Sequence, residues 1–514
     1  MANEASLGKK IFRGTIIIVA VSIAAKLASF LTEAVLAYYL GTSAEGDAYY
    51  MISSLHHVVY PMMSVGIWKV FLPVYKKRMA QGDMDGAAAI ANKVLTFFTL
   101  LSVVIVLGII LFGSGIVSLI APGFEGDTRA LCIRLIRLSA PMYIFIVASA
   151  VYASMLQCHN RFLGSQIREV ASHVPTILAA LLCYRVFGIE ALAYALVVGG
   201  VVRLLVELPF VNWNYRPKLD LQFRSEEFRT ILRRLPSALL SEGVNQINTL
   251  IDKIMASGLP QGSISALNYG AKLTHVFSGL FSSAIATALY PQVIELIARD
   301  RVEELKKLIR KILSIFLLVM LPISIGCILL RRELVTVVYM RGAFDAGSVS
   351  VTASVFACYA AGLLFTACST IINNLFYSYG DTKTPLLISL VNMAVNVAMN
   401  FLLISRFGVS GLAAATTVSS VSTLVIRMIL VRKHVNLEYR RMLEVTLKVL
   451  AATLAGCVLP VVLVQRFMDG SLLRLLVSVG VSAPCYLLLL RMLHVEELHE
   501  ALAVLKNIRK KSKS

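Results

Sequence analysis

Charged residues are scarce in this sequence. Asp, Glu, Lys and Arg make up 15% of its 514 residues, against about a quarter in soluble globular proteins. Hydrophobic residues make up 58%. They gather in runs of roughly 18 to 25 residues, the length that crosses the hydrocarbon core of a membrane. The shortage of charge excludes a string of soluble domains and predicts an all-α polytopic membrane protein.

Several motifs of enzymes and cofactor proteins are also absent. The eight cysteines form no CxxC pair and no metal-ligand spacing, so we expect no metal site. No G-x-x-x-x-G-K-[ST] loop occurs, which argues against an ATPase. No Asp/His/Glu set clusters at a loop–membrane boundary, as a membrane glycosyltransferase would need. We therefore expect no catalytic residues and no cofactor, with a membrane potential or ion gradient as the energy source.

Acidic residues are outnumbered, 29 against 49 Lys and Arg, giving a net charge of +20. In a soluble chain this excess would suggest nucleic acid. In a membrane protein it fits the enrichment of Lys and Arg in cytoplasmic loops. Most basic residues fall into alternate loops, and the number of predicted spans is even. We therefore predict a multi-pass membrane protein with both termini in the cytoplasm and no nucleic-acid partner.

Apolar runs between charged or Gly/Pro breaks predict about fourteen transmembrane helices. Their approximate limits are 13–40, 46–75, 87–118, 129–157, 163–184, 189–212, 231–256, 263–295, 309–330, 346–377, 384–405, 409–430, 443–465 and 473–493.

An internal repeat organises these spans. Segment 187–195 matches 407–415 at an offset of 220 residues, and the breaks at 159–161 and 379–381 share that offset. Six spans per repeat is an even number, so the two lobes should be parallel and enclose a central cavity. The predicted parts are an N-lobe, a C-lobe, two additional C-terminal spans and a basic cytoplasmic tail, at 1–212, 213–430, 431–493 and 494–514.

A few charges fall inside the spans, where each costs about 2.5–3.5 kcal/mol on insertion scales. Lys26, Ser29 and Glu33 share one face of the first span. Lys69 and Lys272 lie in the second and eighth spans. Because cations exceed acids, we predict that Lys26 and Lys272 meet a phosphate or pyrophosphate head group from opposite lobes. A structural Lys26–Glu33 ion pair is the alternative, and intramembrane carboxylates could either bind protons or cations or neutralise the lysines.

Two short outer connections, 41–46 and 257–262, occupy equivalent places in the two repeats. Both are rich in small residues and free of Lys and Arg. Asp47 directly follows the first of them and opens the second span. We predict that the two turns approach each other while the cavity is open to the cytoplasm and separate when it opens outward.

The sequence resembles the MurJ (MviN) lipid II flippases of the multidrug/oligosaccharidyl-lipid/polysaccharide exporter superfamily. The similarity covers essentially the whole chain, including the two extra C-terminal spans. The segments that carry it are 247–252, 256–260, 262–269, 284–291, 341–345, 376–377 and 380–385.

The resemblance implies a flippase of the bacterial inner membrane that moves undecaprenyl-pyrophosphate-linked peptidoglycan precursor from the inner to the outer leaflet by alternating access. The implied partners are lipid II, membrane lipids and the cell-wall synthesis machinery. The family's cations of the first and eighth spans align with Lys26 and Lys272, and its acid opening span 2 aligns with Asp47. Thr32 and Tyr60 stand where the family has two further arginines.

Alternatives to a lipid II flippase differ in substrate. The first is a flippase for another undecaprenyl-linked glycan, such as an O-unit or capsule precursor. This alternative stays open because the sequence lacks two arginines of the family. The second is a cation-coupled multidrug exporter, which the excess of buried cations disfavours.

Overall fold

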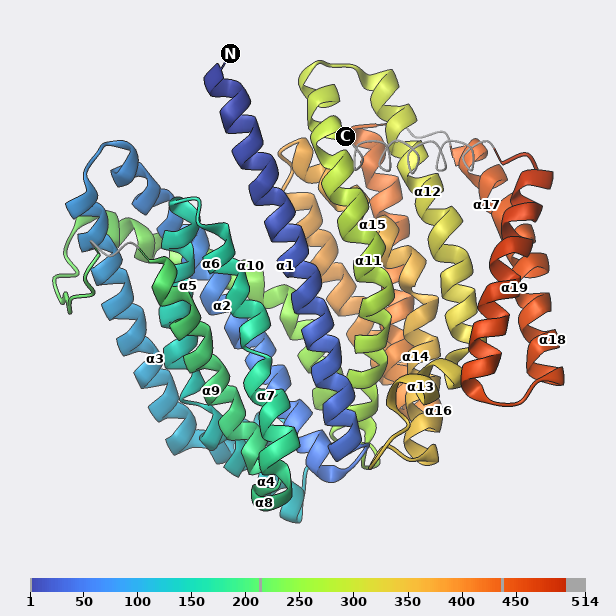
Figure 1. The fold of residues 1–514 in the computed structure, drawn as a ribbon, viewed down its shortest axis with the longest axis horizontal. Coiled ribbons are helices and arrows are strands. Elements are labelled where there is room, and N and C mark those ends of the chain that lie inside the picture. The colour runs from blue at the N-terminus through green and yellow to red at the C-terminus, as the bar shows by residue number, and fades with distance from the viewer. Residues whose placement is uncertain (1, 212–214, 436–438, 496–514) are drawn as a thin grey trace. The chain divides into compact units, whose positions relative to one another are not determined.

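The computed structural model describes residues 2–211, 215–435 and 439–495. Within these ranges all regular secondary structure is helical (Figure 1), which confirms the predicted all-α class. The chain divides into two compact units, 1–265 and 266–514. The predicted lobe limits stay predictions, and most of the predicted basic tail, 496–514, lies outside the described residues.

The first unit contains the first seven predicted spans. Its helices are α1 (Ala2–Leu40), α2 (Ala44–Ala80), α3 (Met84–Ile120), α4 (Gly126–Ser139), α5 (Met142–Cys158), α6 (Phe162–Ala171), α7 (Val174–Leu178), η1 (Ala179–Cys183), α8 (Tyr184–Phe187), α9 (Glu190–Glu207), η2 (Leu208–Phe210) and α10 (Glu226–Ala256).

The second unit contains the remaining spans, and its first helix begins three residues before the boundary. Its helices are α11 (Ser263–Ala298), α12 (Val302–Leu329), α13 (Arg331–Tyr339), α14 (Ala346–Ala361), α15 (Leu363–Ser378), α16 (Lys383–Leu430), η3 (Val431–Lys433), α17 (Tyr439–Thr453), η4 (Leu454–Val458), α18 (Leu459–Phe467) and α19 (Ser471–Met492).

Each predicted span coincides with a helix, part of a longer helix or a run of consecutive shorter helices. The fourth and tenth are helix pairs, α4–α5 and α14–α15, each bent by 41°. Among the described residues, nine helices are long and apolar enough to cross a membrane, or up to eleven with the bent pairs. The count of fourteen stays a prediction. The short helix α13 was not predicted, because its charged residues indicated an outer loop.

Local capping explains where several helices begin. The Ser43 hydroxyl accepts a hydrogen bond from the Gly46 amide at the start of α2, at 3.1 Å. Asp83 accepts from the Gly86 amide at the start of α3, at 2.8 Å. Such side chains satisfy amides that have no partner inside the helix and stabilise its first turn by about 1 kcal/mol.

The backbone repeats where the sequence repeats. Gly188 and Gly408 are 220 residues apart, and they have nearly the same left-handed conformation, φ 58° and ψ −151° against φ 54° and ψ −133°. Asn160 and Gly380, also 220 apart, both have positive φ, 57° and 74°. Each lobe therefore makes the same turns at equivalent positions, and Gly408 divides α16 into the two predicted spans.

Both units have apolar cores between their helices. In the first, α2, α3, α5 and α10 enclose a cluster that includes Phe71, Phe98 and Phe228. Helix α10 lies close against α2, where a side chain at Gly66 would come within 2.6 Å of Leu239. In the second unit, the last two spans pack on α12, and the Tyr486 hydroxyl donates to the Leu318 carbonyl at 2.7 Å.

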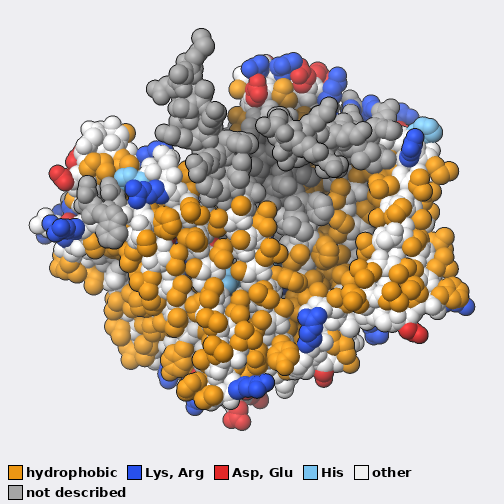
Figure 2. Space-filling model, in the orientation of Figure 1, with side chains coloured by type: hydrophobic (Ala, Val, Ile, Leu, Met, Phe, Trp, Pro, Cys, Tyr) orange, Lys and Arg blue, Asp and Glu red, His pale blue; other side chains and the backbone are white. Residues whose placement is uncertain are grey.

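Large apolar side chains are also exposed along the helices. Figure 2 shows them covering the sides of the helices, with charged side chains mostly towards the helix ends. Leu111, Phe112 and Leu119 on α3 are examples, each at least 70% exposed. A soluble monomer rarely exposes such a continuous apolar surface, and lipid is the solvent that fits it.

Candidate functional site

The predicted acid at the start of α2 holds two turns together. Asp47 is only 4% exposed. Its carboxylate accepts hydrogen bonds from the Gly262 amide at 2.7 Å and from the Ser265 amide and hydroxyl at 2.8 and 2.7 Å. Three donors satisfy a buried carboxylate well. We call Asp47, Gly262 and Ser265 the Asp47 clamp.

The turns that flank the clamp are in direct contact. Gly262 has a left-handed φ of 90°, and a side chain there would come within 2.6 Å of the Thr42 carbonyl oxygen. The Gly123 amide donates to the Ser257 hydroxyl at 3.1 Å and adds a third turn. The predicted approach of 41–46 to 257–262 is thus present in this structure, while their separation in another state stays a prediction.

The polar side chains on one face of α1 become more buried along the helix. Lys26 is exposed and Ser29 is half-buried. One to two turns further, Glu33 is buried and accepts a hydrogen bond from the Tyr50 hydroxyl of α2 at 2.8 Å. Glu33 therefore helps to pack α1 against α2, and Lys26 and Ser29 are the residues of this face that a ligand could reach.

The other predicted cations lie on different helices. Lys69 is exposed on α2, next to Trp68, whose indole donates to Gln157 at 2.8 Å. Lys272 is half-buried on α11 in the second unit. Its convergence with Lys26 on one ligand stays a prediction.

A network of charged side chains and Tyr60 joins α2, α6 and α9 inside the first unit. The Arg203 guanidinium of α9 stacks on the Tyr60 ring of α2, 4.5 Å from its centroid. Glu169 of α6 accepts from Arg203 at 2.7 Å and from the Tyr60 hydroxyl at 3.0 Å. A cation therefore lies beside the position where the resembled family has an arginine in span 2.

The network continues to Arg168 and Glu207. Arg168 of α6 lies between Glu169 and Glu207, 3.5 and 3.4 Å from their nearest carboxylate oxygens. Arg168 falls in the fifth predicted span, and Arg203 and Glu207 fall in the sixth. Their partnership had no local signal, because α6 and α9 are brought together only by folding.

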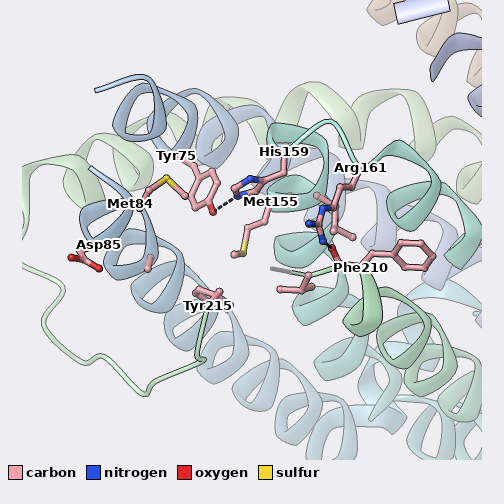
Figure 3. Close-up of a pocket in the computed structure, with 11 residues that line it drawn as sticks. Tyr75, Met84, Asp85, Met155, His159, Arg161, Phe210 and Tyr215 are labelled. Atoms are coloured by element: carbon pink, nitrogen blue, oxygen red, sulfur yellow. Dashed lines mark hydrogen bonds between the residues drawn. The ribbon is translucent and has the colours of Figure 1, made fainter. Parts of the chain in front are cut away.

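A cavity of about 230 Å³ lies at the end of the first unit where α5 ends and α3 begins (Figure 3). The Tyr75 hydroxyl and the His159 Nε2 are 3.1 Å apart, and Arg161 donates to the Phe210 carbonyl at 2.6 Å. Burial and the neighbouring Arg161 lower the pKa of His159, which favours its neutral imidazole. Tyr215 and Asp85 also line the cavity.

The possible metal ligands do not cluster in the part of the chain that the structure describes. Groups of three or more His, Cys, Asp or Glu residues in metal-binding geometry do not occur there. All eight cysteines are free thiols.

The fold is that of a multi-pass α-helical membrane protein built from a repeat. A solved inward-facing multidrug transporter of the MATE family, in the MOP superfamily, has this fold with a TM-score of 0.66, 14% identity and coverage of 81% of this chain and 97% of its own. A solved lipid II flippase MurJ in an inward closed conformation matches with a TM-score of 0.80, 20% identity and coverage of 93% and 99%.

The family itself is set by sequence. The family model described as lipid II flippase MurJ matches residues 36–479. A probable lipid II flippase of Thermotoga maritima is 28% identical over 93% of this chain and 95% of its own length. One of Vibrio cholerae is 26% identical over 81% and 82%. This chain belongs to the MurJ family of lipid II flippases.

Proposed function

We propose that this protein moves lipid II, the undecaprenyl-pyrophosphate-linked peptidoglycan precursor, from the inner to the outer leaflet of the bacterial cell membrane. The observation that carries the proposal is membership of the MurJ family along almost the whole chain. The apolar helices supply the surface that contacts lipid, and the polyprenyl tail stays in that lipid during transport.

The Asp47 clamp gives the proposal a physical gate. In the proposed topology both termini and the basic loops are cytoplasmic, so the turns at 41–46 and 257–262 face outward. Their contact closes the outer side of the first unit. Alternating access then requires the clamp to break before the head group can leave, because a buried carboxylate gives up three hydrogen bonds only when its donors move away.

The head group is a pyrophosphate, and cations are the side chains that recognise it. Lys26 and Lys272 are the proposed ligands, with Ser29 on α1 and Lys69 on α2 as further candidates. We expect no covalent step, no metal and no cofactor. The membrane potential or an ion gradient supplies the energy, and the cell-wall synthesis machinery uses the product on the outer leaflet.

Complementation tests the proposal directly. A bacterial strain whose own lipid II flippase is depleted should grow when this gene is expressed, and lipid II should become accessible on the outer leaflet. A parallel strain that lacks an O-unit flippase should not regain its O-antigen. Growth failure with normal protein levels, together with O-antigen rescue, would replace lipid II by another undecaprenyl-linked glycan.

A further inference from the structure

A buried acid that is not among the proposed lipid II ligands lies in the first unit. Glu207 is the last residue of α9 and is 0% exposed. Among the described residues, neither of its carboxylate oxygens accepts a hydrogen bond. The Arg168 Nη1 is 3.4 Å away, but it donates its hydrogen bonds to the carbonyl and hydroxyl of Ser149, at 3.2 and 3.1 Å. An ionised carboxylate in this setting is poorly stabilised.

The second repeat shows how the same position can hold a charge. Arg427 is the residue 220 positions after Glu207, and it too is buried. Its guanidinium donates to Asn373 at 2.9 Å and to Ser369 at 3.3 Å. The equivalents of these partners near Glu207 are Ala153 and Ser149. The second repeat thus supplies side-chain acceptors for its charge, whereas Ala153 supplies no donor for Glu207.

The neighbouring helices present a defined set of groups to Glu207. Helix α6 presents Arg168 and Glu169, and α5 presents Ser149 and the phenol of Tyr152. Arg203 lies one turn earlier on α9 itself.

The two acids of this set differ in how their charge is stabilised. Glu169 uses both oxygens, one with Tyr60 and one with Arg203, so its negative charge is stabilised. Within the described residues neither Glu207 oxygen is held in this way, although the Ser149 hydroxyl and Arg168 lie beside it. A proton on Glu207 removes the cost of its charge.

We propose that Glu207 is a proton-binding site of this transporter, protonated in the conformation seen here. The proton forms an O–H bond on one carboxyl oxygen, and the positive charge of Arg168 then remains without a full counter-charge. When the O–H bond breaks, the proton passes to water, and the carboxylate becomes the ion-pair partner of Arg168. A change in the spacing of α6 and α9 would therefore be linked to proton uptake and release.

A route to water lies beside the end of α9. Phe210 and Val211, which follow Glu207 in the chain, line the cavity shown in Figure 3. Tyr215 lines the same cavity, and its ring lies 6.2 Å from that of Tyr152, which faces Glu207. The rings of Tyr215 and Tyr152 therefore lie between this cavity and the carboxyl group of Glu207.

Infrared spectroscopy of the purified full-length protein in lipid nanodiscs tests the proposal without lipid II. A protonated carboxyl group has a C=O stretch that a carboxylate lacks. At pH 7, where solution glutamate with a pKa of about 4.3 is ionised, the wild-type protein should show this band. Glu207→Gln should lose it, which the difference between the two spectra isolates from the other buried acids.

Matched variants make the result specific. Glu190→Gln removes an acid from the first turn of the same helix, where it pairs with Arg134, and should leave the band intact. Arg168→Gln removes the nearby cation, so the band should persist to higher pH. A wild-type spectrum identical to that of Glu207→Gln at pH 7 would overturn the proposal, as would a titration that Arg168→Gln leaves unchanged.

Protein stability gives a second measurement. Gln is nearly isosteric with protonated glutamic acid, so Glu207→Gln should keep the melting temperature. A clear loss of stability would show that Glu207 is ionised and paired with Arg168. Neither measurement depends on which lipid the protein moves, so failure of the proton site and failure of the proposed function are separable.

Discussion

Two buried acids of the first unit show that burial alone does not define a residue's role. Asp47 receives three hydrogen bonds from two residues, Gly262 and Ser265, that lie more than 200 residues away in sequence. Glu207 receives none from the described residues. A carboxylate that accepts a full set of hydrogen bonds holds the donating segments in place. A carboxylate that accepts none is a candidate for protonation. The hydrogen bonds that each carboxylate accepts therefore distinguish Asp47, in the proposed gate, from Glu207, the proposed proton-binding site.

Asp47→Asn should loosen the outer turns. The amide keeps one acceptor but points an NH2 group at a backbone donor, which costs roughly 1–3 kcal/mol. An impermeant maleimide should then label a single cysteine at Gln261 several-fold faster than in the parent protein. Asp127→Asn, an exposed acid at the start of α4, is the matched control and should not change the labelling rate. Equal rates in both variants would show that Asp47 does not hold the turns.

Lys26→Ala and Lys272→Ala should each abolish growth of a flippase-depleted strain at normal protein levels, because each removes a cation from the pyrophosphate. Arg at either position should be tolerated better, since a phosphate accepts either cation. Lys76→Ala, an exposed lysine near the end of α2, should grow normally. Wild-type growth of either Lys26→Ala or Lys272→Ala would remove that lysine from the site.

At the scale of elements, hydropathy and the repeat predict most of the fold. The 220-residue offset predicts the turn at Gly408, which divides a helix that would otherwise read as one. The repeat also gives the turns at 41–46 and 257–262 equivalent places between spans, and these turns do touch. Two things lie beyond such reasoning. Asp47 is bound partly by backbone amides, which every residue type except proline carries, so the sequence does not indicate them. The Arg168–Glu207 contact forms only because α6 packs on α9.

The cap of α3 allows a test of pH dependence at a helix end outside the membrane. The Gly86 amide, and then Arg78, lower the pKa of Asp83. A lowered carboxyl pKa means that the cap stabilises the helix above the usual carboxyl range and is lost only as pH falls through the lowered value. Between pH 5 and 8 the first turn of α3 should therefore have constant protection from hydrogen exchange.

Asp83→Ala should raise exchange in residues 84–88 about five-fold, the equivalent of a cap worth about 1 kcal/mol. Asp85→Ala changes an exposed acid two residues further on and serves as the control, because it caps nothing. Protection in wild type that falls between pH 8 and 5 would contradict the lowered pKa.

At the scale of the whole molecule, a flippase must close one side before it opens the other, and the outer turns are where that closure can be trapped. Residues 43 and 261 lie in turns that already touch, since a side chain at Gly262 would meet Thr42. A disulfide needs Cα atoms within about 7 Å. Cysteines at Ser43 and Gln261, in a background without the native eight, should crosslink on mild oxidation.

The crosslinked protein should fail to move lipid II to the outer leaflet and should recover when the disulfide is reduced. Each single-cysteine variant, oxidised in the same way, should stay active, which excludes damage by the oxidant. Absence of a crosslink would remove this pair of turns as the gate. Full activity of the crosslinked protein would mean that the turns never separate, and alternating access through this gate would have to be abandoned. Inhibition that reduction reverses would show that opening of the outer turns is an obligatory step of transport.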